Sequence, residues 1–195
     1  MGPTMIERTE RKLRETEFFW LKLHGERDKI GTNSPEAFQN YLSSFLSAGR
    51  AVTLALQWEE KEKYDSWFSN WAATQLTEEQ RKLISFMVRQ RNYEQKRGGA
   101  ETIIETEFVP MIDVRQGPQG QTYGLENMSL GSPPVLLGIT RFDSSHTIER
   151  PAHYFDFGGK TDVVSTCEKY RDILQKIVRE FKEAHPESPA TQEAK

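Results

Sequence analysis

The sequence predicts a mainly α-helical fold, an up-and-down helical bundle with a small β-rich insertion between the fourth and fifth helices. Three observations support this fold class. Apolar residues recur every three or four positions in four stretches before residue 99 and again between residues 163 and 181. Glycine and proline gather between residues 117 and 138, where this period is lost. The last amphipathic stretch has no helical neighbour in its own half of the chain, so it must bury its apolar side against the earlier helices.

The composition limits the classes of protein to which this chain can belong. It has 195 residues, a net charge of -3 and 11% aromatic residues, and disordered chains are poor in aromatics. The slightly acidic balance excludes a globally basic protein that coats nucleic acid. No stretch approaches the roughly 18 apolar residues of a membrane span, and the charged first fourteen residues lack the apolar core of a secretory signal. With Cys167 as the single cysteine, we expect a cytoplasmic protein without disulfides and without a membrane partner.

The first two helices are marked by their end signals. The first is expected from Glu7 to Leu23, with Gly25 as its stop. The second opens with a capping serine, Ser34, followed by a first-turn proline and an acid at the positive end of the helix dipole. Its apolar period predicts a length of about 24 residues. Gly49 lies inside this second helix, and since glycine costs about 1 kcal/mol there, we expect another helix to cross closely at that point.

The third and fourth helices are expected to be shorter. Aromatic residues at helical spacing predict the third from Tyr64 to Ala73. Thr77 and Gln80 have the spacing of a capping box, which opens the fourth helix, and the glycine pair that begins at Gly98 ends it. The apolar side of the fourth helix is expected to consist of Leu83, Ile84, Met87 and Val88.

The middle of the chain favours strands and turns. The segment from Thr102 to Val114 is rich in isoleucine, threonine and valine and predicts a strand, with Pro110 as a break or an edge marker. A turn is expected at residues 117–120. Shorter strands are expected at Gln121 to Tyr123, Val135 to Phe142 and Ile148 to Phe157.

A last helix follows the strands. Thr161 and Asp162 cap it, and His185 with Pro186 ends it. Its apolar stripe consists of Val163, Val164, Cys167, Tyr170, Leu174, Ile177, Val178 and Phe181. The glycine-rich residues 158–161 are interpreted as a turn and a cap, because a phosphate loop would require a glycine at Tyr154. The chain is therefore divided into a helical bundle (1–99), a β-rich insertion (100–160), the final bundle helix (161–186) and a polar tail expected to be mobile (187–195).

The fourth helix carries the strongest candidate site. Between Arg81 and Arg97 it holds six lysines and arginines against one acid, Glu94, in an otherwise acidic chain. A solvated helix face explains such a run as well as a site does, because the helix dipole favours cations near the C-terminus. Arg91 is less easily explained in this way, since the apolar period of the helix, continued by three or four residues, reaches its position. An inward guanidinium must be paired or bound to an anion.

Several of these segments together resemble a known family of helical bundles. The stretch from Tyr41 to Thr53, the aromatic helix with Trp67 and Phe68, and Arg91-Asn92 before the glycine pair are similar to the HEPN superfamily. The resemblance covers roughly residues 1–99 and the last helix. It implies binding of nucleotides or RNA, because many members are ribonucleases or toxin–antitoxin partners. It also implies a homodimer, since family bundles commonly pair so that their arginine-centred helices meet in a shared cleft.

One departure from the family pattern bears on catalysis. Active members carry a histidine that is separated from the arginine by four to six residues, and this chain has Lys96, Arg97 and Gly98 at those positions. Lysine does not easily replace a neutral imidazole at pH 7, because its ordinary pKa is about 10.4. We therefore expect no catalytic residues, no metal and no cofactor. The expected function is non-catalytic binding of RNA, a nucleotide or another phosphate-bearing or acidic partner. The residues expected to bind it are Arg91, Asn92, Lys96, Arg89 and Arg97.

Two other functions remain open at this point. The first is a ribonuclease that uses Arg91 and Asn92 with Lys96, or with a histidine brought close by the fold. The second is a protein-interaction scaffold that acts through residues 115–150 of the insertion. Pairing of two copies through the fourth helix would place roughly ten positive charges in one cleft, which is costly unless an anion neutralises them.

Overall fold

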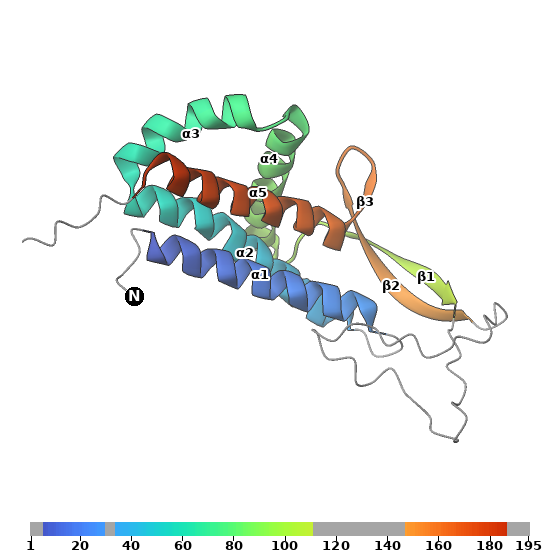
Figure 1. Cartoon of the computed structure of the whole chain (residues 1–195). Helices are drawn as coiled ribbons and strands as arrows, with labels where there is room; N and C mark the ends of the chain where they lie inside the picture. The colour runs from blue at the N-terminus through green and yellow to red at the C-terminus, as the bar shows by residue number, and fades with distance from the viewer. Residues whose placement is uncertain (1–5, 30–33, 111–146, 187–195) are drawn as a thin grey trace, which may run out of the picture. The chain divides into compact units, whose positions relative to one another are not determined.

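The computed structural model describes residues 6–29, 34–110 and 147–186. Figure 1 shows the order of the elements. They are α1 (Glu7–Asp28), α2 (Pro35–Glu59), α3 (Lys61–Gln75), α4 (Glu78–Arg97), β1 (Ile103–Pro110), β2 (Thr147–Asp156), β3 (Lys160–Asp162) and α5 (Val163–Ala184). This order confirms a mainly helical protein with strands between the fourth and fifth helices. The chain forms two compact units, one of Met1–Glu105 with Pro151–Lys195 and one of Thr106–Arg150.

In the first unit, α1 and α2 form an antiparallel pair that is tied at both ends. Glu59 of α2 accepts hydrogen bonds from the backbone N–H groups of Arg8 and Thr9, at 2.7 and 3.0 Å. These donors belong to the first turn of α1, which has no intrahelical acceptor for them. At the opposite end, the buried Glu26 of α1 accepts a hydrogen bond at 2.7 Å from the backbone N–H of Ser34, the N-cap of α2. Each helix therefore supplies an acid to an end of the other.

The last helix, α5, closes the bundle by packing against α1, α2 and α4. Its end lies beside the start of α1, where Lys182 forms an ion pair with Glu10. Its middle crosses α2 so closely that a Cβ atom on Gly49 would lie 2.8 Å from Cε1 of Tyr170. The predicted close crossing at Gly49 is confirmed, and it explains why this helix contains a glycine despite its propensity cost. All eight residues predicted for the apolar stripe of α5 are buried.

The start and end of α4 follow the sequence signals. Its capping box is present, with Gln80 N–H donating to Oγ1 of Thr77 at 3.2 Å and Thr77 N–H donating to Oε1 of Gln80 at 3.0 Å. Gly98 ends the helix at a φ of 76°, a conformation that glycine adopts without strain. In Figure 1, α4 runs across the direction shared by α1, α2 and α5, so the up-and-down arrangement does not extend to it.

Two predicted helix boundaries were wrong. The first helix does not stop at Gly25 but continues to Asp28. One exposed glycine costs only about 1 kcal/mol in a helix, and the turn that follows contains Glu26, which binds the start of α2. The third helix is longer than predicted and runs from Lys61 to Gln75. Its added residues are polar and carry no hydrophobic period.

The strands form a sheet in the order β1-β2-β3. β2 and β3 are antiparallel, with Tyr154 opposite Asp162 and Asp156 opposite Lys160. Gly158 and Gly159 make the turn between them at positive φ. The expected turn is thus confirmed. β3 itself was not predicted, because three residues are too few to show an alternating pattern.

Two predicted strands, at residues 121–123 and 135–142, and the predicted turn at 117–120 lie outside the described residues, as does the tail at 187–195. In the second unit, Arg150 of β2 donates two hydrogen bonds to Oε2 of Glu107 on β1, at 3.0 Å from Nε and 2.9 Å from Nη2. No helix in the described ranges is long and apolar enough to cross a membrane.

Candidate anion-binding site

Arg91 lies at the edge of the bundle and is only partly satisfied there. It is half-buried, and its buried Nε atom has no hydrogen-bond partner in the part of the chain that the structure describes. One terminal nitrogen donates a hydrogen bond to Oδ1 of Asn92 at 3.4 Å, near the limit for such a bond. The fully buried polar position of this helix is instead the preceding residue, Gln90, whose side-chain oxygen accepts a hydrogen bond from Glu101 N–H at 3.0 Å.

The predicted phase of α4 was therefore shifted slightly from the observed one. The helix buries Leu83, Phe86, Met87 and Gln90, whereas Ile84 and Val88 are partly buried on its flank. This phase places the guanidinium of Arg91 between the core and the solvent. A group in that position has lost part of its hydration and remains accessible to a ligand.

The other residues predicted to bind a ligand are exposed on α4. They are Arg89, Asn92, Lys96 and Arg97. The guanidinium of Arg97 lies 5.0 Å from the ring centre of Tyr93, and that of Arg89 lies 5.9 Å from the ring centre of Phe86. In the part of the chain that the structure describes, no carboxylate forms an ion pair with Arg89, Arg91, Lys96 or Arg97. The one acid in this stretch, Glu94, accepts a hydrogen bond from the hydroxyl of Ser43 on α2.

The first two cations of the helix have structural partners instead. Arg81 donates hydrogen bonds to backbone carbonyls at the end of α3, those of Leu76 at 2.5 Å and Ala72 at 3.2 Å. Carbonyls at a helix C-terminus lack intrahelical donors, so Arg81 serves as a cap for α3. Lys82 forms an ion pair with Glu78 one turn earlier, at 2.6 Å. Among the described residues, Arg81 and Lys82 thus have structural partners, and the other four cations have no carboxylate partner.

No described histidine is bonded to Arg91. His24 is on α1, where it contacts Asp28. His185 follows α5, where Nδ1 lies 3.1 Å from the carbonyl oxygen of the preceding turn. His153 is buried on β2, and His146 lies outside the described residues.

His153 is an unusual buried group in its own right. Its ring stacks on Phe38 with a centroid distance of 3.9 Å and an interplanar angle of 11°. Burial lowers the pKa of His153, although the nearby charge of Asp162 acts in the opposite direction. Its buried Nδ1 atom has no hydrogen-bond partner among the described residues. Cys167 is fully buried too, and burial raises the pKa of its thiol, which makes it a poor nucleophile.

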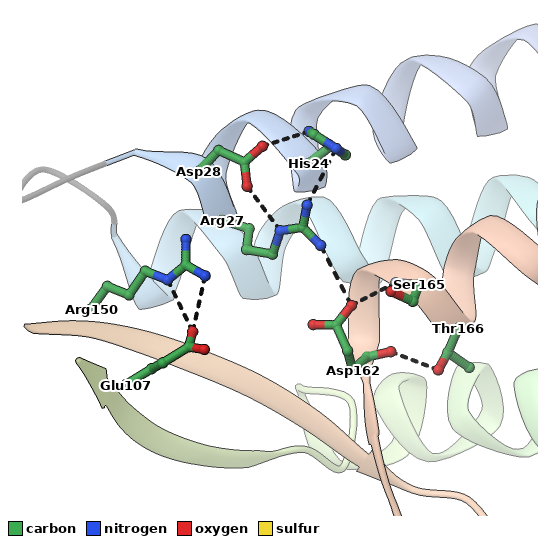
Figure 2. A network of polar contacts seen from close by, with 8 residues as sticks. All are labelled: His24, Arg27, Asp28, Glu107, Arg150, Asp162, Ser165 and Thr166. Atoms are coloured by element: carbon green, nitrogen blue, oxygen red, sulfur yellow. Dashed lines mark hydrogen bonds and ion pairs between the residues drawn. The ribbon is translucent and has the colours of Figure 1, made fainter. Parts of the chain in front are cut away.

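A second polar cluster joins the end of α1 to the start of α5, and Figure 2 shows its side chains turned towards one another. Arg27 donates to Oδ1 of Asp28 at 2.9 Å and lies 3.6 Å from Oδ1 of Asp162. Asp162 caps α5 by accepting a hydrogen bond from Ser165 N–H at 2.7 Å. His24 lies 2.9 Å from Asp28 and 3.3 Å from Arg27. These groups satisfy one another, so we assign the cluster a structural role.

A groove of about 430 Å³ lies between the first half of α4 and the turn that joins β2 to β3. Lys82, Ser85 and Arg89 line it from the helix, and Asp156 and Phe157 line it from the turn. Sequence reasoning did not find this groove, because its two walls are about seventy residues apart in the chain. Among the described residues, no group of three or more histidines, cysteines or acids is arranged to hold a metal ion.

No family model, curated protein or solved structure matches this chain. The function is therefore inferred from the residues and their geometry.

Proposed function

We propose that this chain is a non-catalytic binding module that holds single-stranded RNA through the basic face of α4. The observation that supports the proposal is the set of four cations, Arg89, Arg91, Lys96 and Arg97, that have no carboxylate partner among the described residues. They lie within three turns of one helix in a chain whose net charge is negative. Such a local excess of charge attracts a polyanion and raises its local concentration.

Arg91 gives the proposed site its specificity for phosphate. Its guanidinium has a planar set of donors that matches phosphate oxygens, and partial burial strengthens each charge-assisted hydrogen bond. The buried Nε of this residue has no partner in the described protein, so a ligand oxygen that reached it would satisfy a donor that is otherwise costly to bury. Asn92 is beside it and offers an amide for a second hydrogen bond.

We also propose that the bundle is HEPN-like and that Lys96 stands where active members have their histidine. The long antiparallel pair α1 and α2, the aromatic α3 and the arginine on α4 support the resemblance. In this proposal, two copies pair through α4 only when an anion neutralises the facing charges.

The test is binding of a fluorescein-labelled 20-nucleotide oligouridylate, measured by fluorescence anisotropy between 50 and 300 mM salt. Phosphate contacts make log K fall linearly with log salt, and each contact on a single strand adds about 0.7 to the slope. We expect Arg91→Gln and Lys96→Gln each to weaken binding and to reduce the slope. The matched control is Arg179→Gln, which removes the same charge from an exposed position on α5. Equal affinities for all three variants, or no binding by the wild-type chain at 50 mM salt, would contradict the proposal.

The same mixtures, run on a denaturing gel, test the ribonuclease alternative. RNA cleavage that disappears in Arg91→Gln would support this alternative. Because no described histidine is bonded to Arg91, a different group would then act as the base. If RNA neither binds nor is cleaved, and changes at residues 115–150 abolish capture of a partner protein, the scaffold alternative is supported.

A further inference from the structure

Among the described residues that line the groove between α4 and the β2–β3 turn, one cation is available for a ligand. Arg81 is occupied by the carbonyls at the end of α3, and the charge of Lys82 is matched by Glu78 at 2.6 Å. Arg89 lines the same groove, is exposed and forms no ion pair with a described carboxylate. Its guanidinium is held over the ring of Phe86, at 5.9 Å from the ring centre. A ligand anion that enters the groove therefore meets a positioned guanidinium.

The other residues of the groove indicate which further groups the ligand carries besides its anion. The carboxylate of Asp156 and the hydroxyl of Ser85 accept hydrogen bonds, and Phe157 contributes a partly buried aromatic ring. The ring of Phe157 lies 4.8 Å from that of Phe86, so it is fixed by packing. A free phosphate ion would leave the aromatic ring and both acceptors without a role.

A ribonucleotide matches all of these groups. Its phosphate accepts hydrogen bonds from a guanidinium, its 2′-hydroxyl donates one to a carboxylate, and its base stacks on an aromatic ring. We infer that this groove binds one ribonucleotide of the RNA strand, with the phosphate at Arg89, the ribose at Asp156 and the base against Phe157. The volume of about 430 Å³ lies in the range of small-molecule sites. The inference rests on the proposed function and assigns it a nucleotide subsite.

The groove is continuous with the proposed RNA site. Lys82, Ser85, Arg89, Asn92 and Lys96 recur at intervals of three or four residues and are all exposed, so they form one line along α4. At 1.5 Å per residue this line is about 21 Å long. A single strand laid along it would place one nucleotide in the groove while its neighbours contact Asn92 and Lys96.

The experiment compares 10-nucleotide strands of identical sequence in ribose and deoxyribose form, by anisotropy at one salt concentration. We expect the wild-type chain to bind the RNA strand more tightly than the DNA strand. Asp156→Asn should bring the two affinities together, because the amide is a weaker acceptor for the 2′-hydroxyl. Arg89→Gln and Phe157→Leu should weaken binding of both strands by about tenfold, since each removes a phosphate or stacking contact. Arg179→Gln is again the charge-matched control, and thermal unfolding checks that each variant is folded.

The outcomes separate this inference from the proposed function. If Arg91→Gln and Lys96→Gln weaken RNA binding while Asp156→Asn and Phe157→Leu bind both strands like the control, the nucleotide subsite is refuted and the proposed function stands. If the wild-type chain binds no oligonucleotide, the proposed function fails. The groove is then judged with adenosine monophosphate and its 2′-deoxy form by ligand-observed NMR. Absence of AMP binding, or AMP binding that ignores Asp156→Asn, overturns the subsite as well.

Discussion

Arg27 and Arg91 are both partly buried arginines on long helices, but their surroundings differ. Arg27 contacts Asp28, His24 and Asp162, and it joins the end of α1 to the start of α5. Among the described residues, Arg91 forms a hydrogen bond only with the neighbouring Asn92, at 3.4 Å, and its buried Nε has no partner. The first arginine is satisfied by the folded chain. Burial of the Arg91 donor costs folding free energy that no described residue offsets.

This difference separates charges that maintain the fold from charges available to a ligand. A buried donor without a partner lowers stability by about 1–3 kcal/mol. Proteins depart from good local design mainly where function requires it. We therefore expect substitutions at the α1–α5 junction to lower stability without changing RNA binding. Substitutions on the α4 face should weaken RNA binding without lowering stability.

The largest effect is expected at the junction. Asp162→Ala removes the cap of α5 and one partner of Arg27, so the free energy of unfolding should fall by about 1–2 kcal/mol. Urea unfolding followed by circular dichroism measures the change. The control is Asp172→Ala on the surface of the same helix, where loss of an exposed pair with Arg171 should cost less than about 0.5 kcal/mol. Equal losses for the two variants would show that Asp162 has no special role.

The next prediction is a change in stability that has opposite signs for Arg91 and Arg27. Arg91→Met replaces a guanidinium with an unmet donor by an apolar chain of similar length, so unfolding free energy should rise by about 1 kcal/mol while RNA binding weakens. Arg27→Met should lower stability and leave RNA binding unchanged. Both variants are measured by urea unfolding and by anisotropy. A loss of stability in Arg91→Met would mean that this side chain has a structural partner after all.

A smaller effect is expected from His153, the buried ring whose Nδ1 also lacks a partner. Its folded-state pKa is lowered by burial, so the unfolded chain binds the proton more readily. The folded protein therefore has its full stability above about pH 6.5, the ordinary pKa of histidine. It loses stability as the pH falls from that value towards the folded-state pKa of His153. His153→Phe keeps an aromatic ring against Phe38 and should flatten this dependence between pH 7.5 and 5. Identical pH profiles for the two proteins would argue that His153 does not titrate on unfolding.

The smallest effect on stability is expected on the exposed face of α4. Arg97→Ala should change the free energy of unfolding by less than about 0.5 kcal/mol, because among the described residues this side chain makes only an exposed contact, with Tyr93. The slope of RNA affinity against salt should nevertheless fall by about 0.7. Differential scanning calorimetry and anisotropy give the two numbers. A large drop in melting temperature would show instead that Arg97 stabilises the fold.

The local features of this fold could be read from the sequence. The cap at Ser34, the capping box at Thr77 and the apolar stripe of α5 involve residues within a few turns of one another, and the structure has all three. The close contact at Gly49 was predictable as well, because a glycine inside a long amphipathic helix needs a reason.

Features that depend on distant residues could not be predicted. The continuation of α1 past Gly25 depends on the bond from Glu26 to the start of α2. The groove forms where Phe157 lies against α4, and no local sequence pattern predicts that contact. For Arg91, the sequence placed the residue near the core boundary, but one step of helical phase decided whether Gln90 or Arg91 was fully buried.

The ion pair between Lys182 and Glu10 has a consequence for how the protein is made. The helix α1 meets this packing partner only after the chain as far as α5 has been synthesised. Until then, the apolar surface that α5 covers on α1 and α2 is open to solvent and to other chains. Newly made molecules should therefore depend on chaperones that shield such surfaces until α5 has been synthesised.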